Sequence, residues 1–142
     1  MKIGELAEQS GLSTHTLRYY EKQGLIQASS RSASNYRIYD QQGLDTARFI
    51  KRSREIGFSL EEVSVFLSIR ADKPAHVCAE AKILAENKII EVKEKIEEMK
   101  QVVVALHKLS DACCGGEKSA EFCSILAALE NKIPDNITGA HK

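Results

Sequence analysis

Residues 76–123 read HVCAEAKILAENKIIEVKEKIEEMKQVVVALHKLSDACCGGEKSAEFC, a long helical pattern with one cysteine near its start and a cysteine-rich loop at its end. Within it, apolar residues recur at alternating steps of three and four, with glutamate and lysine between them: Ile89, Val92, Ile96, Met99, Val103 and Leu106. This heptad spacing is typical of the seam of a two-stranded coiled coil. The stretch therefore predicts a long helix through which two copies of the chain form a homodimer.

The same heptad phase places a cysteine on the seam at each end. Cys78 and Cys113 both fall on it, and a straight helix with a rise of ~1.5 Å per residue would hold them roughly 50 Å apart. One chain alone therefore could not chelate an ion with both. In an antiparallel dimer that crosses near Ile96, Cys78 of one protomer would meet the loop of the other, which carries Cys113, Cys114 and Cys123. The pattern predicts two identical thiolate clusters, one at each end of the dimer.

The composition favours a cytoplasmic protein. The chain has 142 residues, 43% of them apolar and 28% charged, which suits one compact domain with an appendage. No stretch approaches the ~20 uninterrupted apolar residues that span a bilayer, and the first residues lack the apolar block of a signal peptide. We therefore expect a cytosolic chain without a membrane partner, whose thiols stay reduced. Four cysteines in that compartment favour metal ligands or redox groups over structural disulfides.

Charge is distributed unevenly along the chain, although the formal net charge is zero. Residues 1–54 are rich in cations, whereas the chain from Glu55 onward is slightly acidic. A basic head on a neutral or acidic stalk suits a polyanion at one end of the chain only.

The basic segment begins with a predicted helix-turn-helix. Residues 3–9 form a short amphipathic helix, SGLS forms a turn with Ser13 as N-cap, and residues 14–22 form a second helix that ends before Gly24. The outer face of the second helix carries four residues that can contact phosphates and base edges in a major groove: His15, Thr16, Arg18 and Tyr19. The alternative is that the tyrosine packs and the arginine is a solvated charge.

Residues 29–40, SSRSASNYRIYD, predict a β-hairpin. A run of small polar residues precedes an alternating Tyr-Arg-Ile-Tyr segment, as in a turn followed by a returning strand. Such a wing, with Arg31, Tyr36 and Arg37, suits a grip on the sugar-phosphate backbone beside the second helix. The alternative is a strand pair that only covers the core of the head.

Two further helices follow the hairpin. Asp40 can cap a helix whose inward side includes Ile56 and whose exposed side carries cations, among them Arg54. Ser59 and Glu62 form a capping box for the next helix. A second basic unit at this distance would let one head touch the DNA backbone at two places.

Pro74 should end any helix before it, which places a hinge between head and stalk. The alternative is a mere connector. The predicted fold is mainly α: a winged helix-turn-helix head, a long antiparallel coiled-coil helix and a C-terminal metal-binding loop. Its predicted parts are a DNA-binding domain at 1–70, a hinge at 71–75, a dimerisation helix at 76–110, a metal-binding loop with a short helix at 111–130 and a flexible tail at 131–142.

The chemistry of the loop favours a divalent thiophilic ion. Three or four thiolates suit tetrahedral Zn²⁺, or the larger Cd²⁺, Pb²⁺ and Hg²⁺. A glycine pair frees the backbone after the adjacent Cys113 and Cys114, and Cys123 returns at loop-closing distance. Two loop thiolates alone could hold a monovalent copper ion, whereas Cys78 from a partner adds the charge that a divalent ion requires. A structural zinc that is always bound is the alternative to a sensing site.

Three motifs, IGELAEQSGLSTHTLRYYEKQGLI at 3–26, SNYRIYD at 34–40 and FIKRSREIGFSLEEV at 49–63, resemble the MerR family of bacterial transcription regulators. With the long helix that follows, the resemblance covers essentially the whole chain. The ending DACCGG…FCSILAALE and the isolated Cys78 look most like the zinc-responsive branch. The resemblance implies a dimeric activator, not an enzyme, whose metal-loaded form bends and untwists a promoter for RNA polymerase and switches on a zinc or heavy-metal efflux or resistance gene.

Carried over by position, the resemblance implies DNA contacts at Arg18, Tyr19, Tyr36 and Arg37, and metal ligands at the four cysteines. One departure is Lys118, where the zinc branch has a histidine. A lysine ammonium, with a pKa of about 10, is a poor ligand at neutral pH. A second ion would need another donor, such as His76 beside Cys78, or Asp111, Glu117 or Glu121 in and beside the loop. The alternative is a site for a single ion.

A thiol redox switch that uses Cys113, Cys114 and Cys123 is the alternative from another class, and the same DNA head would serve it. A redox sensor would respond to oxidant without metal and form a disulfide, whereas a metal sensor would respond under full reduction. No histidine stands beside a lone cysteine in a recognisable pocket, so the sequence does not favour an enzyme.

Overall fold

The structure, a computed structural model, describes residues 1–113, 115–117 and 119–130. These residues are mainly α-helical and include a two-stranded antiparallel sheet, which confirms the predicted fold class. The chain divides into two compact units, Met1–Lys88 and a second unit that begins at Ile89. The predicted division into head, hinge, stalk and loop stays a prediction. The predicted flexible tail at 131–142 lies outside the described residues.

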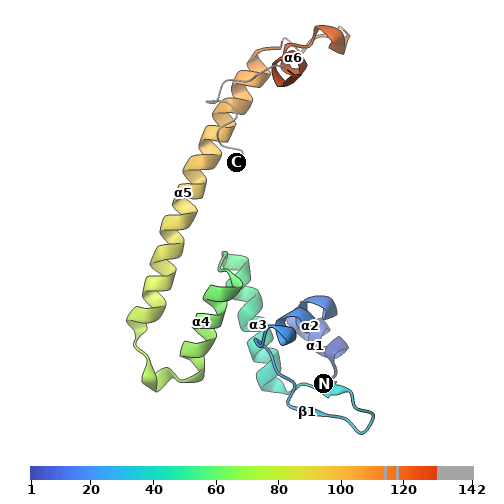
Figure 1. The fold of residues 1–142 in the computed structure, drawn as a ribbon, viewed down its shortest axis with the longest axis vertical. Helices are drawn as coiled ribbons and strands as arrows, with labels where there is room; N and C mark the ends of the chain where they lie inside the picture. Colours follow the sequence, from blue (N-terminus) through green and yellow to red (C-terminus); the bar gives the residue numbers. More distant parts are fainter. Residues whose placement is uncertain (114, 118, 131–142) are drawn as a thin grey trace. The chain divides into compact units, whose positions relative to one another are not determined.

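The first two helices form the predicted helix-turn-helix, α1 (Ile3–Ser10) and α2 (Thr14–Lys22) (Figure 1). Gly11 ends α1 with a φ of 77°, a left-handed conformation that glycine adopts without strain. A Cβ at this position would lie 2.8 Å from Lys51 Nζ. Ser13 caps α2 as predicted, because its side chain accepts a hydrogen bond from a backbone N–H of the first turn at 3.0 Å.

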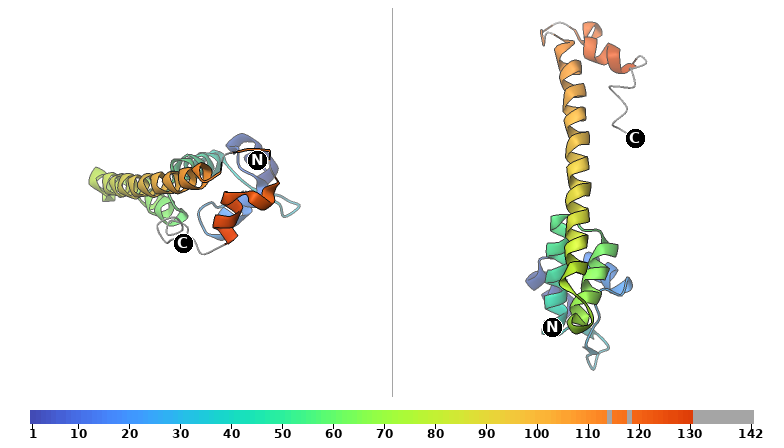
Figure 2. Two further views of the ribbon diagram at one scale, coloured as in Figure 1. Left: turned by 90° about the horizontal axis from the view of Figure 1, so that it is seen from above. Right: turned by 90° about the vertical axis from the view of Figure 1, so that its left-hand side faces the viewer.

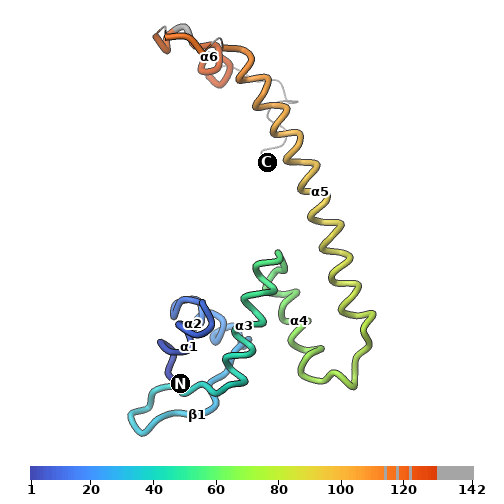
Figure 3. The backbone as a smooth tube through the Cα atoms, turned by 180° about the vertical axis from the view of Figure 1, so that it is seen from behind, coloured from blue at the N-terminus to red at the C-terminus, as the bar shows by residue number. Residues whose placement is uncertain are grey.

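The predicted hairpin is present, and its paired segments are short (Figure 3). β1 (Ser30–Arg31) pairs antiparallel with β2 (Arg37–Ile38). Asn35 lies in the connecting turn with a φ of 68°, a conformation that asparagine tolerates better than most residues. Beyond β2, Tyr39 is buried, and its backbone exchanges two hydrogen bonds with the backbone of Met1, each 2.7 Å long. One end of the hairpin is therefore fastened to the start of the chain.

Helices α3 (Gln41–Ile56) and α4 (Leu60–Ala71) complete the first unit, and both start at predicted caps. Asp40 caps α3 by accepting a hydrogen bond from a first-turn N–H at 3.0 Å. At α4 the capping box is complete: the Ser59 N–H donates to Glu62 Oε1 at 2.8 Å, and the Glu62 N–H donates to Ser59 Oγ at 3.2 Å.

The core of this unit collects buried side chains from α1 to α4 and from the segments beside the hairpin: Leu6, Leu17, Tyr20, Ile26, Tyr39, Leu44, Ala47, Ile50, Phe58 and Val63. The prediction that Ile56 points inward is wrong, because 69% of it is exposed. Gly57 ends α3 in a left-handed conformation with a φ of 113°, so the chain turns there and Phe58 enters the core instead. The Phe58 ring packs edge-on against Phe66, with 4.9 Å between the ring centroids.

The first turns of the next helix, α5 (Cys78–Asp111), belong to the same compact unit. Lys88 on α5 is 8% exposed, and its Nζ lies 2.9 Å from Glu62 Oε1 and 5.9 Å from the Phe58 ring centroid. The Ser59 N–H, followed by Lys88, holds the pKa of Glu62 below its ordinary value. The start of the long helix is therefore fastened to the capped end of α4.

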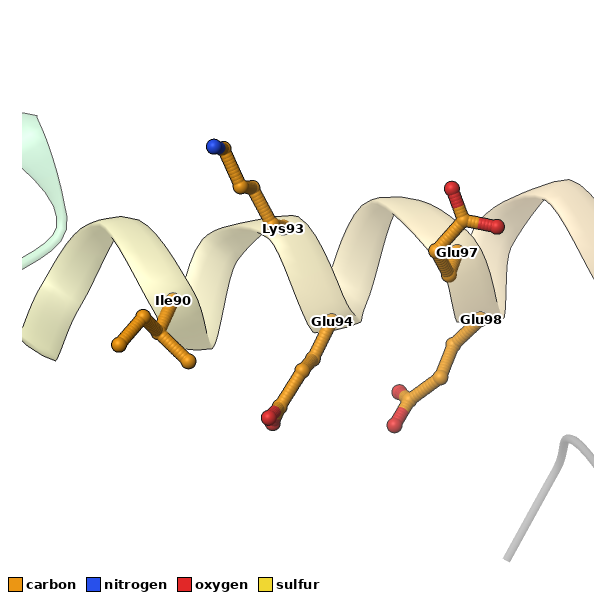
Figure 4. Close-up of a pocket in the computed structure, with 5 residues that line it drawn as sticks. All are labelled: Ile90, Lys93, Glu94, Glu97 and Glu98. Atoms are coloured by element: carbon orange, nitrogen blue, oxygen red, sulfur yellow. The ribbon is translucent and has the colours of Figure 1, made fainter.

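Helix α5 is preceded by η1 (Lys73–Ala75) and is one continuous helix of 34 residues (Figure 2). The six predicted seam residues of the long helix are each between 38% and 56% exposed. Figure 4 shows a stretch of its surface where Ile90, Glu94 and Glu98 point to one side. Because the residues around this hollow all come from one helix, it is an open surface and not an enclosed site.

The described chain closes with η2 (Ala120–Phe122) and α6 (Ser124–Glu130), the latter at the position predicted for a short helix. Within the parts of the chain that the structure describes, every helix is too short or too polar to cross a membrane.

Candidate DNA interface and metal centre

The predicted DNA-contacting residues on α2 lie mostly on its open face. His15 and Arg18 are exposed, and Tyr19 is 47% exposed, whereas Leu17 is buried in the core. Thr16 is partly buried because it belongs to the cap: the Ser13 hydroxyl donates to its Oγ1 at 2.8 Å. The helix therefore presents a cation, an imidazole and a phenol to solvent, all suited to phosphates and base edges.

The wing presents Tyr36 and Arg37 and uses Arg31 differently. Tyr36 is 59% exposed, and Lys2 Nζ lies 4.5 Å from its ring centroid, a cation–π contact. The Arg37 side chain is 49% exposed. Arg31 braces the turn, since its Nη1 donates to the Asn35 carbonyl oxygen at 3.0 Å. The wing thus has an exposed aromatic and basic edge held by an internal brace.

Arg54 lies beside the turn between α3 and α4. It is exposed, and its Nη1 donates to the Phe58 carbonyl oxygen at 3.0 Å. The guanidinium therefore stabilises this turn and leaves a positive charge on the surface beside the start of α4, where helix N–H groups also favour anions.

Glu21 is a functional candidate that the sequence reasoning missed. From the last turn of α2, its Oε1 accepts a hydrogen bond from the Tyr39 hydroxyl at 3.1 Å and pairs with Arg37 Nε at 3.2 Å. Burial, and then the neighbouring Glu21, raise the pKa of Tyr39 above its ordinary value. The signal in the sequence was an acid two residues after Tyr19, the last predicted contact residue of α2, in a cation-rich segment.

Two of the predicted metal ligands lie together in the second unit. Cys113 follows the end of α5, and Cys123 immediately precedes α6. The backbone N–H of Leu126 lowers the pKa of the Cys123 thiol against a partial opposing effect of burial, and the Ile125 N–H and a hydrogen bond with the Cys113 side chain lower it further. A thiol with a depressed pKa is more readily present as the thiolate that binds metal.

Of the other two predicted cysteine ligands, the structure describes Cys78. Cys78 is exposed at the first position of α5 and belongs to the first unit. Cys114 and Lys118 lie outside the described residues. Across the residues that the structure does describe, no three histidine, cysteine or acidic side chains gather as a metal site.

The four candidate extra donors have their own positions. His76 Nδ1 lies 3.0 Å from Glu80 Oε1, just before α5. Asp111 is the last residue of α5, and Glu117 and Glu121 are exposed in the segment between the two cysteines. Within the described part of one chain, none of them joins a group of three metal-binding side chains.

Comparison with known proteins identifies the chain. The family described as MerR HTH family regulatory protein matches residues 1–68, and the family described as MerR, DNA binding matches residues 44–109. The chain is similar to the HTH-type transcriptional regulator ZntR of Escherichia coli (strain K12), with 40% identity over 91% of this chain and 92% of that protein. The chain belongs to the MerR family of transcription regulators. Its relatives are DNA-binding regulators and not enzymes.

Two solved MerR-family structures extend the likeness to the fold. The transcription regulator PbrR691 from Ralstonia metallidurans CH34, in complex with lead(II), aligns with a TM-score of 0.77 and 32% identity over 91% of this chain and 98% of that one. The regulator MerR from Bacillus megaterium MB1, in complex with mercury(II), aligns with a TM-score of 0.64 and 32% identity over 92% of this chain and 100% of that one. A heavy-metal-sensing activator fits these similarities.

Proposed function

We propose that this MerR-family chain is a homodimeric activator that binds a promoter through its winged helix-turn-helix and a thiophilic divalent ion through its cysteines. Each ion would be held by Cys113, Cys114 and Cys123 of one protomer and by Cys78 of the other. Metal binding would change the separation of the two heads, distort the promoter and so allow RNA polymerase to start transcription of a metal efflux or resistance gene in the cytosol.

The observation that carries this proposal is the contact between the Cys113 and Cys123 thiols, with the pKa of Cys123 lowered at the start of α6. Two neighbouring sulfurs, one of them disposed to ionise, form the start of a thiolate site and fit a borderline or soft ion. When bound, the ion would supply a cross-link between thiolates. The chain's own residues supply the rest: the lowered pKa of Cys123 favours its thiolate form, and Gly115, whose N–H donates to Cys113 Sγ at 3.5 Å, stabilises charge on the second sulfur.

Two thiolates do not satisfy a divalent ion, and this requirement points to a second protomer. Tetrahedral Zn²⁺ needs four ligands, and three or four of them are thiolates in sites of this composition. Cys78 is exposed and therefore accessible to a partner's loop. We place zinc ahead of cadmium and lead, because a site with up to four thiolates from Cys78, Cys113, Cys114 and Cys123 matches its coordination number and its borderline softness.

The surface of α5 supports a dimer. Its seam leaves a row of large apolar side chains at 38% to 56% exposure, spaced at steps of three and four. Burying such a row against a second copy removes apolar area from water, at roughly 25 cal/mol per Å². The antiparallel arrangement is preferred because it brings Cys78 of each protomer to the loop of the other, with both sites related by the two-fold axis.

Mixing two inactive variants tests the shared site directly. Cys78→Ser removes the stalk ligand, and Cys113→Ser removes a loop ligand. If the ligands come from two chains, a heterodimer of the two variants contains one intact site, made of Cys78 from one variant and Cys113 from the other. The two reduced variants would be unfolded and refolded together, then titrated with Cd²⁺ while thiolate-to-metal absorption is recorded. The matched control is Ser124→Ala, a change next to Cys123 that removes no thiol.

Trans coordination predicts tight binding of about one ion per heterodimer in the mixture, although each variant alone binds weakly. If the mixture binds Cd²⁺ no more tightly than each variant does alone, the ligands are not shared between protomers. Tight binding by Cys78→Ser alone would remove that residue from the ligand set.

A thiol redox switch is a second candidate function, favoured by the same hydrogen bond between Cys113 and Cys123. Two neighbouring thiols can lose two electrons and two protons to an oxidant and form a disulfide. Exposure of the metal-free protein to hydrogen peroxide separates the two functions. A redox switch predicts a transcriptional response together with the mass loss of two hydrogens, whereas a metal sensor predicts no productive response until an ion is added under reduction.

A further inference from the structure

Glu21 is an acidic side chain on a surface that must approach a polyanion. It lies on α2, three residues after Arg18, and its side chain is 17% exposed. An acid next to a DNA contact weakens DNA binding through charge repulsion, unless its contacts within the protein favour binding by more than this repulsion costs. One of its two carboxylate oxygens, Oε1, contacts both the Tyr39 hydroxyl at 3.1 Å and Arg37 Nε at 3.2 Å.

The wing needs such an attachment because its own pairing is minimal. Each of its strands has two residues, and an isolated two-stranded ribbon is marginally stable in water. Tyr39 supplies the fixed point: it is 2% exposed, and its backbone is bonded to Met1 on both its N–H and its carbonyl. The buried phenol holds the Glu21 carboxylate, and the carboxylate in turn holds Arg37.

This chain of contacts determines how the Arg37 guanidinium is presented. Glu21 engages Nε, the guanidinium nitrogen nearest the main chain. A guanidinium carries five N–H donors in a planar fork, so a partner at Nε restricts the plane of the fork while the two Nη groups can still donate to phosphate oxygens. The Arg37 side chain is 49% exposed, so its outer part is accessible.

We propose that Glu21 is a positioning residue for DNA binding, which orients Arg37 and locks the wing to α2 so that both grip the DNA as one rigid unit. This inference rests on the wing contact with DNA in the proposed function. Because the guanidinium is oriented before DNA arrives, less conformational entropy is lost when the phosphate contact forms.

The direction in which one substitution changes DNA affinity separates this positioning role from simple charge repulsion. Glu21→Gln removes the negative charge and keeps the size of the side chain. If the carboxylate only repels DNA, the variant binds more tightly than the wild type. If the carboxylate positions Arg37, the variant binds more weakly, because an amide oxygen holds a guanidinium less strongly than a carboxylate does.

The experiment is a double-mutant cycle on the full-length protein. The probe is a labelled DNA duplex that the wild-type protein selects from a random-sequence pool, and binding is followed by fluorescence anisotropy. The variants are Glu21→Gln, Arg37→Ala and the two combined. Glu8→Gln is the matched control, since it makes the same charge change at an exposed position of α1. Equal thermal unfolding midpoints at one protomer concentration confirm that the variants are folded.

We expect Glu21→Gln to weaken binding by about fivefold and Arg37→Ala by about tenfold, with the double variant within about twofold of Arg37→Ala. The control should stay within about twofold of the wild type. The positioning role would be overturned if Glu21→Gln bound DNA more tightly than the wild type. It would also be overturned if Glu21→Gln weakened binding as much in the Arg37→Ala background as in the wild type, or if Glu8→Gln weakened binding as much as Glu21→Gln. Wild-type binding by Arg37→Ala would instead remove the wing contact from the proposed function.

Discussion

The ion pair that fastens α5 to α4 makes a quantitative prediction about stability. Lys88 is 8% exposed, and its Nζ lies 2.9 Å from Glu62 Oε1. Lys88→Met replaces the ammonium by an apolar group of similar length and leaves Glu62 bonded to the Ser59 N–H. Glu62→Ala does the opposite: it removes the side-chain half of the capping box of α4 and takes one carboxylate away from a largely buried ammonium.

The two substitutions should therefore lower the free energy of unfolding by different amounts. Breaking a fully buried pair by removing one partner costs about 3–5 kcal/mol. The Glu62 side chain is 26% exposed, which reduces the effect, so we expect Glu62→Ala to lower the free energy of unfolding by about 2–3 kcal/mol, cap included. Lys88→Met should cost about 1 kcal/mol or less. Because no buried charge remains in the double variant, its cost should fall short of the sum by about 1–2 kcal/mol.

Urea unfolding at a fixed protomer concentration is the assay, since association with a partner would shift the midpoint by mass action. The chain contains a matched control in the pair of Lys100 and Glu97, which has a distance of 3.0 Å but side chains that are 65% and 69% exposed. The same cycle on that pair should give a coupling within about 0.5 kcal/mol. Additive costs at the buried pair, or a larger cost for Lys88→Met than for Glu62→Ala, would refute the reasoning.

Three further outcomes follow from the same geometry. Arg18→Ala should weaken promoter binding by about tenfold and reduce the slope of log affinity against log salt by about one, as measured by anisotropy at several salt concentrations; an unchanged slope would remove Arg18 from the phosphate contacts. Cys78→Ser should keep promoter affinity within about twofold but abolish metal-induced transcription; loss of DNA binding would contradict this division of roles. The folded-state pKa of Glu62 is depressed, so its stabilising contribution is complete above the ordinary glutamate pKa of about 4.3 and is lost as the pH falls through the folded value. The stability difference between wild type and Lys88→Met, from urea unfolding at several pH values, should accordingly shrink with acidification.

Much of the head could be predicted because its signals are local. The caps at Ser13, Asp40 and Ser59 each use a side chain and a backbone N–H within three residues, so the pattern of the sequence contains both partners. The heptad spacing of α5 and the short helix after Cys123 are local in the same sense. The capped helices and the short helix begin where the sequence predicts them, and α5 begins at Cys78, two residues after the predicted start at residue 76.

The missed features depend on contacts between distant parts of the chain. Glu21 meets Tyr39 across 18 positions, and Lys88 meets Glu62 from a different helix, so neither pair has a spacing that periodicity could reveal. Ile56 was misplaced for a different reason. It comes nine residues after the buried Ala47, which at about 100° per residue puts it on the opposite face of α3. Beyond the left-handed turn at Gly57, Phe58 takes the place in the core.

The candidate thiol site also combines local and non-local features. The residue types and spacing of the loop between Cys113 and Cys123 suggest a chelating segment, which stays a prediction. The lowered pKa of Cys123 depends on N–H groups of α6 that only the folded backbone aligns. The role proposed for Cys78 requires a second protomer, which the sequence of one chain indicates only through the heptad spacing of α5.

Transcription in vitro from the cognate promoter, with fully reduced protein and buffered free zinc, cadmium, lead or copper(I), tests the central claim most directly. A metal-sensing activator predicts that transcript rises with a divalent ion under reduction, with zinc effective at the lowest free concentration, and that Cys78→Ser abolishes the rise. No response to any ion under full reduction, together with activation by oxidant alone, would contradict the account.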